Sequence, residues 1–339
     1  MNREKILKNM KGFCNACPSC DGRFCAGKVP GMGGVGSGSS FMTNVSDLKK
    51  YKLNMKVMSC EREPDPSIEL FGFKLSFPLF AAPIGGVPFN VSKTVTEIEY
   101  ASAIIDGCKS RGIIGCTGDG PQDYVSKEGY TSIKMAGGKG IPFIKPWEEN
   151  LLMERLQGAN EIGCEYIGMD VDSIGLINIK VNGGSMPIRN SNQYKELFEK
   201  LPFKIIVKGI MDPEEAEKCV DMGVAGIIVS NHGGRILDHS RSTVSALPDI
   251  VRAVDGRVPV LVDGGIRSGF DMVKMMALGA DAVLIGRPFA IAAMSDLENG
   301  TREYIDKIKY QFIQAMLMTG CSSIKELKEN GHNIIFESN

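Results

Sequence analysis

The chain has 339 residues, of which 43% are hydrophobic and 23% are charged, the balance of a soluble globular protein that can bury a large core. Lysine and arginine total 39 against 40 acidic residues, and the net charge of −1 provides no general attraction to nucleic acid or anionic lipid. No segment reaches the roughly eighteen uncharged apolar residues of a membrane span, and no signal peptide opens the sequence. We therefore expect a cytoplasmic protein without a nucleic-acid or membrane partner.

Four cysteines stand within twelve residues near the start of the chain, at Cys14, Cys17, Cys20 and Cys25. Their spacing is similar to that of iron–sulfur loops, and four thiolates also suit structural zinc. The other six cysteines are scattered through apolar segments, so a disulfide scaffold is a poor explanation for a chain of this length. We predict a metal at these four residues, either a four-iron cluster, which we favour, or zinc.

A glycine-rich loop over residues 30–40 follows the cysteines, and residues 1–40 are predicted to form a cysteine- and glycine-rich extension. From about residue 75, short apolar runs alternate with helical stretches such as Pro213–Met222 and Phe270–Leu278, which is typical of βα units around a parallel sheet. Eight such runs favour a closed (β/α)₈ TIM barrel over residues 41–330 rather than an open doubly wound sheet. The predicted strands are Leu79–Pro83, Gly112–Cys116, Pro142–Lys145, Tyr166–Val171, Lys204–Lys208, Gly226–Ser230, Val258–Asp263 and Ala282–Gly286.

Glycines and arginines follow the seventh and eighth predicted strands, where TIM barrels usually bind phosphate. Gly264, Gly265 and Gly286 would let backbone N–H groups approach an anion, and Arg267 and Arg287 can donate paired hydrogen bonds to it. The alternative is a pair of tight turns with surface arginines. Two such loops at these strands favour a phosphate site, without showing which molecule carries the phosphate.

His232 and Arg235 leave the sixth predicted strand together, separated by two glycines. An imidazole can accept a proton near neutral pH, and a guanidinium can hold a carboxylate in a fixed fork, so the pair suits a 2-hydroxy acid as substrate. Asp172, after the fourth strand, is our candidate to orient the histidine, although it could instead cap the next segment. Lys208, at the end of the fifth strand, would face an anionic partner in the barrel mouth.

The segment Ser230-Asn231-His232-Gly233-Gly234-Arg235, followed by Asp263-Gly264-Gly265-Ile266-Arg267 and Gly286-Arg287, resembles the FMN-dependent 2-hydroxy-acid oxidase and dehydrogenase family over about residues 30–320. The resemblance implies that His232 is the base, that Arg235 and His232 bind substrate, and that Asp172 orients the histidine. It also implies that Lys208 lies beside the flavin N1 and O2. The residues that the resemblance assigns to FMN are Pro83, Ile84, Gly85, Thr117, Lys208, Ser230, Asp263, Gly264, Gly265, Arg267, Gly286 and Arg287.

The sequence departs from the family pattern at three substrate or flavin contacts. The tyrosine near the glycine-rich loop is absent, and Phe143-Ile144-Lys145-Pro146-Trp147 stands where the family has a second tyrosine. A second carboxylate-binding arginine is also missing after Asp172, where Lys180 or Arg189 could substitute. The identity of the substrate is therefore open, with lactate as the default.

We expect oxidation of a small 2-hydroxy acid to the 2-oxo acid, with an unidentified electron acceptor. Gly85 and Gly86 replace the alanine-like residues of several oxidases, which favours a dehydrogenase over an oxidase. The alternatives are a flavin-dependent isomerase without net oxidation, against which the His-Gly-Gly-Arg segment counts, and a non-catalytic flavin or metal sensor. The resemblance also implies a homo-oligomer, with a tetramer as the usual form.

Overall fold

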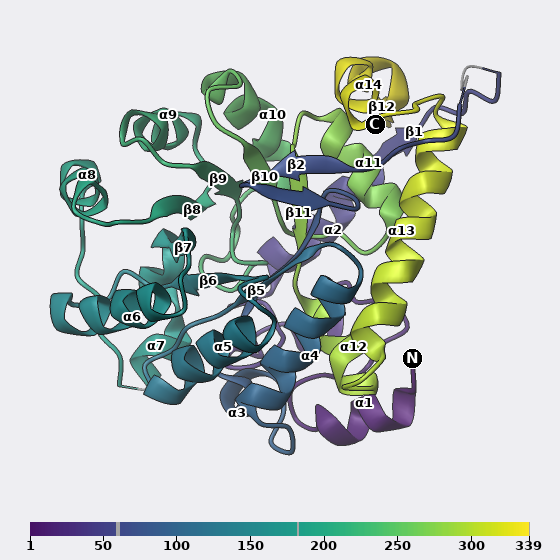
Figure 1. Ribbon diagram of the computed structural model, residues 1–339. Coiled ribbons are helices and arrows are strands. Elements are labelled where there is room, and N and C mark those ends of the chain that lie inside the picture. The colour runs from purple at the N-terminus through teal and green to yellow at the C-terminus, as the bar shows by residue number, and fades with distance from the viewer. Residues whose placement is uncertain (59–61, 182, 339) are drawn as a thin grey trace.

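The computed structural model describes residues 1–58, 62–181 and 183–338. Eight parallel strands close into a barrel with helices around it (Figure 1). The strands follow one another around the barrel in chain order, and the last pairs with the first. The predicted (β/α)₈ fold is therefore confirmed. The barrel strands are β4 (Leu79–Ile84), β5 (Ile114–Thr117), β6 (Ile141–Ile144), β7 (Tyr166–Asp170), β8 (Lys204–Ile210), β9 (Gly226–Val229), β10 (Val260–Val262) and β11 (Ala282–Ile285).

The observed strands overlap all eight predicted ones, and only their ends differ. The strand predicted from Gly112 begins at Ile114, because Gly112 adopts a left-handed φ of 67° in the turn that precedes it. Conversely, β8 continues two residues beyond Lys208, through an irregularity in its pairing with β9. Most positions of these short strands are buried, which is why they read as unbroken apolar runs.

Several of the helices begin at side-chain caps. Thr96 and Glu99 form a capping box at the start of α4, and the Asp212 carboxylate caps α9 just before Pro213. The barrel helices are α4 (Glu97–Ser110), α5 (Asp123–Met135), α6 (Glu149–Glu161), α8 (Ser191–Glu199), α9 (Pro213–Asp221), α10 (Thr243–Val254), α11 (Gly269–Ala277), α12 (Arg287–Ser295) and α13 (Gly300–Met318). The other elements are α1 (Arg3–Asn9), η1 (Arg23–Cys25), α2 (Ser39–Lys50), β1 (Tyr51–Leu53), β2 (Ile68–Leu70), β3 (Phe73–Leu75), α3 (Val87–Asn90), η2 (Val171–Gly175), α7 (Ile177–Val181), α14 (Ile324–Glu329), α15 (Gly331–Ile334) and β12 (Ile335–Glu337).

The β2–β3 hairpin closes the amino-terminal end of the barrel. Leu70 and Phe71 pack with interior side chains of the strands, and the Phe71 ring lies so close to Gly226, the first residue of β9, that a Cβ there would clash with it. Because this hairpin covers one end of the barrel, the open end is the one where the strands finish. That end is the face on which TIM barrels place their active sites.

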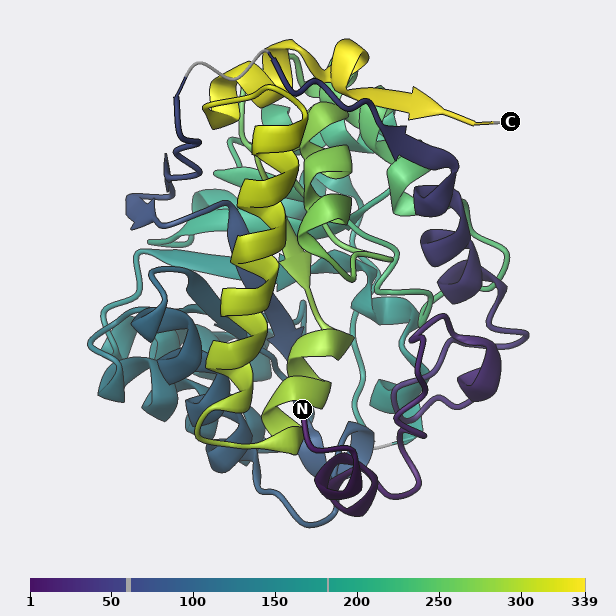
Figure 2. The same cartoon turned by 90° about the vertical axis from the view of Figure 1, so that its right-hand side faces the viewer.

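The N-terminal extension lies against the open end of the barrel. The side chain of Asn9 donates to the carbonyl of Met294 in α12, and the Val35 N–H donates to the carbonyl of Gly234 in the β9 loop. Figure 2 shows this segment in purple beside α12, with the C-terminal strand β12 at the other end of the molecule. The extension therefore contributes to the surroundings of the site. The predicted boundary at residue 40, between the extension and the barrel, stays a prediction.

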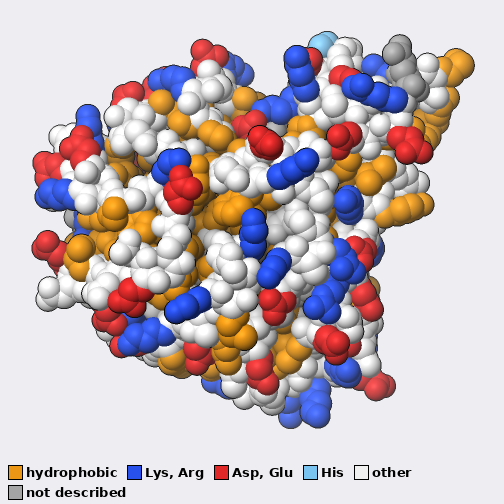
Figure 3. All heavy atoms as spheres, in the orientation of Figure 1, with side chains coloured by type: hydrophobic (Ala, Val, Ile, Leu, Met, Phe, Trp, Pro, Cys, Tyr) orange, Lys and Arg blue, Asp and Glu red, His pale blue; other side chains and the backbone are white. Residues whose placement is uncertain are grey.

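The exterior carries charges of both signs. Figure 3 shows lysine, arginine and carboxylate side chains interspersed over one face, in keeping with the net charge of −1. Within the described ranges, every helix is too short or too polar to cross a bilayer.

Close packing between α11 and α13 gives a first test of the fold. A Cβ at Gly269 would collide with the backbone of Ile308 and Phe312. We expect Gly269→Ala to lower the free energy of unfolding by about 1–3 kcal/mol, because two packed helices must separate. Urea denaturation measures the change. Lys307→Ala, on the exposed face of α13, is the control and should change the unfolding free energy by less than about 0.5 kcal/mol. Equal stability of both variants would contradict the packing.

Candidate active site

One pocket opens at the carboxyl ends of the barrel strands. Lys208 reaches it from β8, His232 from the β9 loop, Asp263 from the β10 loop and Arg287 from the start of α12. These side chains are far apart in the sequence and were expected to converge at this face. Of the predicted site residues, the pocket is lined by Pro83, Ile84, Gly85, Lys208, His232, Arg235, Asp263, Gly264, Gly265, Arg267, Gly286 and Arg287.

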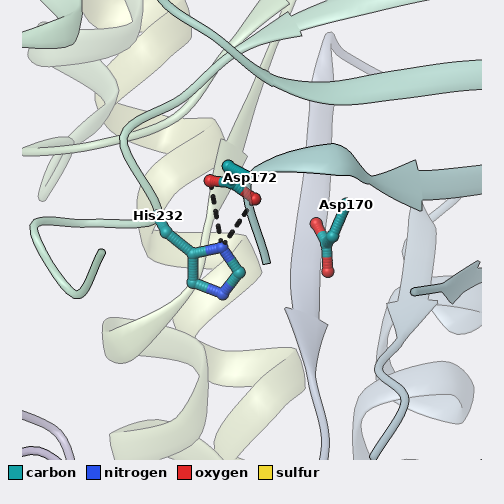
Figure 4. Close-up of side chains that lie close together, drawn as sticks. All are labelled: Asp170, Asp172 and His232. Carbon is teal, nitrogen blue, oxygen red and sulfur yellow. Dashed lines mark hydrogen bonds and ion pairs between the residues drawn. The ribbon is translucent and has the colours of Figure 1, made fainter. Parts of the chain in front are cut away.

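His232 and Asp172 form a hydrogen-bonded pair at the edge of this pocket. The Nδ1 atom of His232 lies 3.1 and 3.2 Å from the two carboxylate oxygens of Asp172 (Figure 4). His232 has a φ of 55°, an unusual backbone conformation for a residue with a side chain, and its N–H donates to the Ser230 hydroxyl. Because Asp172 engages Nδ1, the Nε2 atom is left for a ligand in the pocket.

The surroundings of His232 favour the neutral imidazole. Burial lowers its pKa below the ordinary value of 6.5, and the ammonium of Lys208 lowers it further, while Asp172 acts in the opposite direction. The balance leaves His232 unprotonated near neutral pH, as a proton acceptor must be. Asp172 would stabilise the imidazolium if His232 took up a proton.

Two lysines share a buried carboxylate on the floor of the pocket. Lys208 Nζ lies 3.0 Å from Asp170 and 3.9 Å from Asp263, and Lys145 Nζ lies 3.4 Å from Asp170. Burial by itself would raise the pKa of Asp170, but the two ammonium groups outweigh it and hold the pKa below its ordinary value. The sequence analysis assigned no role to Asp170 or Lys145. The signal was present, because Asp170 is the last residue of β7 and Lys145 directly follows β6.

Arg235 places a cation in the pocket, and none of the described carboxylates forms an ion pair with it. Its Nη2 donates to the Asn90 side chain at 3.0 Å, and in the described part of the chain its shielded Nε has no hydrogen-bond partner. Burial lowers the pKa of Arg235 to about 10, so it stays charged at neutral pH. The guanidinium is thus available to an incoming anion.

A buried carboxylate fixes the turn that follows β4 by hydrogen bonds to its backbone. Glu97 accepts hydrogen bonds from the N–H groups of Gly86 and Val87, and burial raises its pKa to about 7. Asn90 donates to the carbonyls of Gly85 and Gly86, so the residue that contacts Arg235 also fixes this turn. Sequence reasoning found Gly85 and missed Glu97 and Asn90, which carry no motif.

Trp147 stands where the family has a substrate tyrosine, but it is fully buried outside the pocket lining. Its Nε1 donates to Asp119 at 2.6 Å, and Asp119 also forms an ion pair with buried Arg155. Arg189, a suggested substitute for the missing arginine, donates to the carbonyls of Pro146 and Trp147. The side chain of Lys180, the other suggestion, lies outside the described residues.

Two residues assigned to FMN by resemblance lie outside the pocket lining. Thr117 turns its side chain toward Gly129 of α5, where an added Cβ would lie 3.0 Å from the Thr117 hydroxyl. Ser230 is fully buried and accepts the N–H of His232. Their contacts with a flavin stay predictions.

A metal ion is an alternative occupant of the same floor. Among the described residues, only Asp170, Asp172 and His232 bring three ligand atoms within 4.8 Å of one another. Two lysines already pair with Asp170, however, so positive charge is supplied there by the protein itself.

Comparison with known proteins identifies the family. A model of the FMN-dependent dehydrogenase family matches residues 31–183 and 180–333. The chain belongs to this family. The L-lactate dehydrogenase of Haemophilus influenzae (strain ATCC 51907 / DSM 11121 / KW20 / Rd) is 31% identical over 87% of this chain and 91% of its own length. The predicted resemblance is confirmed, and the chain is an FMN-dependent hydroxy-acid oxidoreductase.

Other members of the FMN-dependent dehydrogenase family show how far the likeness extends. The peroxisomal (S)-2-hydroxyacid oxidase GLO3 of Arabidopsis thaliana is 49% identical, but the match spans only 37% of this chain and 35% of the oxidase. The solved structure of mandelate oxidase with (S)-2-phenylpropionate superposes with a TM-score of 0.76 at 26% identity, covering 93% of each chain. These relatives act on different hydroxy acids by name, so the family does not settle the substrate.

The pocket fits the FMN phosphate at the β10 and β11 loops. Gly264 and Gly265 have left-handed φ values of 90° and 79°, and a Cβ at Gly265 would collide with Asn44. The helix α12 starts at Arg287 without a side-chain cap, which leaves its first N–H groups for an anion. Lys208 would face the flavin ring from the floor, where its ammonium suits negative charge on a reduced flavin.

The four predicted metal ligands line a second, smaller pocket, in the extension ahead of the region that matches the family. Cys14, Cys17, Cys20 and Cys25 line it together with Phe13, Met32, Ile291 and other residues. Arg267 Nε donates to the Cys20 carbonyl at 3.0 Å, and its Nη2 lies 3.7 Å from the Cys20 sulfur. Nothing in the family match accounts for these cysteines.

Lysine substitutions on β8 test the FMN pocket. We expect Lys208→Met to weaken FMN binding at least tenfold, because Asp170 and Asp263 would lose their shared cation beside the flavin. Quenching of flavin fluorescence during titration measures the dissociation constant. Lys204→Met, at the exposed start of the same strand, is the control and should leave the affinity unchanged. Unchanged FMN affinity in the Lys208 variant would contradict this role.

Proposed function

We propose that the protein oxidises a small 2-hydroxy acid to its 2-oxo acid and acts as a dehydrogenase rather than an oxidase. The observation that carries this proposal is the meeting in one pocket of a neutral, carboxylate-bound imidazole and a guanidinium for which the described residues supply no ion pair. His232 and Arg235 are three residues apart, and both line the FMN pocket. A 2-hydroxy carboxylate presents the two groups that they would bind, a hydroxyl and a carboxylate.

Each side chain has a separate task in this reaction. Arg235 binds the substrate carboxylate, and Asn90 holds the guanidinium in place. His232 accepts a proton from the substrate at Nε2, and Asp172 stabilises the resulting imidazolium through Nδ1. FMN, when bound, accepts the two electrons that leave the substrate. Lys208 stabilises the negative charge that those electrons bring to the floor of the pocket.

The lining of the pocket supports a substrate with a small apolar side chain. Met32, Phe89, Leu176 and Ile179 line it, whereas the tyrosines of the family pattern are absent. Lactate and slightly longer 2-hydroxy acids suit such a surface, because their side chains offer no polar group that would lose water without a partner. Lactate is the first substrate to test, since full-length relatives are named for it.

Two features favour a dehydrogenase. Gly85 and Gly86 take the place of alanine-like residues of several oxidases, and Asn90 and Glu97 fix their turn. The four N-terminal cysteines line one pocket, and we propose that they hold a metal, either a four-iron cluster or zinc. An iron cluster would offer electrons an exit that does not require oxygen.

Anaerobic mixing with 2-hydroxy acids tests the reaction. We expect lactate or a close homologue to bleach the flavin absorbance, and His232→Ala to slow bleaching by about 10²–10⁴-fold, because the variant lacks the imidazole that accepts the proton. His332→Ala, at an exposed position of α15, is the control and should bleach at the wild-type rate. If no acid bleaches the flavin, the proposed oxidation is wrong and the isomerase or sensor alternatives are favoured.

The dependence of kcat/KM on pH tests the His232–Asp172 pair. We expect activity to fall as pH drops through a pKa below 6.5, because protonated His232 cannot accept a proton. In Asp172→Asn the acidic limb should move to lower pH, since the carboxylate raises the pKa of His232, and the plateau should fall at least tenfold. A limb that stays in place in this variant would show that another group titrates.

A further inference from the structure

We propose that Cys14, Cys17, Cys20 and Cys25 bind a four-iron cluster that takes electrons from reduced FMN and passes them singly to a one-electron carrier. The proposal rests on the proposed oxidation only for the source of the electrons. The site itself is argued from the cysteine pocket and its contacts with the flavin pocket.

The loop that carries the cysteines is shaped around a small pocket. All four cysteines line it, and apart from the short η1 the segment has no regular structure. Ala16 and Gly22 adopt left-handed φ values of 46° and 91°, so the chain turns sharply between the first two cysteines and again between the last two. Phe13, Met32 and Ile291 give the pocket apolar walls, which suit a buried cluster.

The spacing of the sulfur atoms favours an iron–sulfur cluster over zinc. Tetrahedral zinc with bonds of about 2.3 Å requires four sulfurs roughly 3.8 Å apart. Yet the cysteines form no group of three whose sulfurs lie within 4.8 Å of one another, in a segment that the structure describes throughout. In a four-iron cluster each thiolate binds a different iron atom, so the sulfurs stand farther apart.

Cations and N–H groups lie where such a cluster would need them. Arg267 lies 3.7 Å from the Cys20 sulfur, and the Ala16 N–H donates to the Cys14 sulfur at 3.4 Å. The guanidinium of Arg287 also lies along this pocket. Thiolate-bound clusters are anionic and gain negative charge on reduction, so these contacts favour the reduced form and raise its potential. A structural zinc site has no need of redox tuning.

The cysteine pocket and the FMN pocket share a wall. Met32 and Arg287 line both pockets, and Arg287 Nε donates to the Met32 carbonyl at 2.7 Å. Arg267 also lines the flavin pocket while it contacts Cys20. The partition is therefore about one side chain thick, and electrons can cross such a partition without an open channel.

The electrons balance with a one-electron carrier as oxidant. Conversion of the 2-hydroxy acid to the 2-oxo acid releases two electrons and two protons, and FMN takes both electrons. The cluster accepts one electron at a time, so two reduced carriers leave per substrate oxidised, and two protons pass to solvent. The carrier belongs to the class of small iron–sulfur or flavin electron-transfer proteins.

The first measurement is metal content and electron uptake of the FMN-loaded chain isolated without oxygen and supplied with ferrous iron and sulfide. We expect about four iron and four sulfide per chain, and uptake of about three electrons from dithionite, two by the flavin and one by the cluster. A low-temperature EPR signal should accompany the third electron. Stoichiometric zinc, with no sulfide bound, would overturn the proposal.

The second measurement delivers electrons through the flavin. Photoreduction of bound FMN with EDTA should generate the same EPR signal, and so should a 2-hydroxy acid. If every acid fails but photoreduction succeeds, the proposed substrate reaction is wrong and the relay stands. A cluster that dithionite reduces but the photoreduced flavin does not would overturn the relay.

Cysteine variants connect the signal to these residues. Cys20→Ser should lose the EPR signal and take up about two electrons instead of three. Cys164→Ser, at a half-buried cysteine outside the pocket, is the control and should keep the signal. Far-UV circular dichroism reports whether each variant is folded. A folded Cys20→Ser chain that keeps the cluster signal would contradict the assignment.

Discussion

A lysine and an aspartate on neighbouring strands, both almost completely buried, determine the electrostatics of the site. Asp170 and Lys208 are direct partners in the β7–β8 ladder, and their charged groups lie 3.0 Å apart. A buried ion pair is stable only when further groups satisfy both partners, and here Lys145 and Asp263 complete it. The ammonium of Lys208 also lowers the pKa of His232, so the protonation of this histidine depends on the Asp170–Lys208 ion pair.

The remaining charges of the pocket are arranged for anions. Arg235 contacts a neutral amide, and no ion pair is found for it among the described residues. At the other end of the pocket, N–H groups are added by the turns at Gly264 and Gly265 and by the start of α12, which has no side-chain cap. In the proposed reaction the compensating negative charge would arrive with the ligands, the FMN phosphate at one end and the substrate carboxylate at the other.

The sequence predicted the strands that repeat along the chain and the site residues that belong to a recognisable motif. The eight apolar runs predicted the barrel, because both faces of its strands are buried. His232, Arg235 and the glycine loops could be recognised from their residue types at the ends of predicted strands. Asn90 and Glu97 could not be predicted in this way, since their importance comes from contacts with Arg235 and the Gly86 turn. Thr117 was assigned to FMN by resemblance alone. It is the last residue of β5 and its side chain lies against Gly129 of α5, so its contact with a flavin stays a prediction.

The wall formed by Met32 and Arg287 has a thermodynamic consequence. Arg287 starts the helix at the phosphate end of the flavin pocket and also lines the cysteine pocket. If the cysteines hold the proposed cluster, a ligand in one pocket would fix a side chain that the other pocket uses, and the second ligand would then bind more tightly. Thermodynamic reciprocity would require the same factor in both directions, so each cofactor would improve the loading of the other.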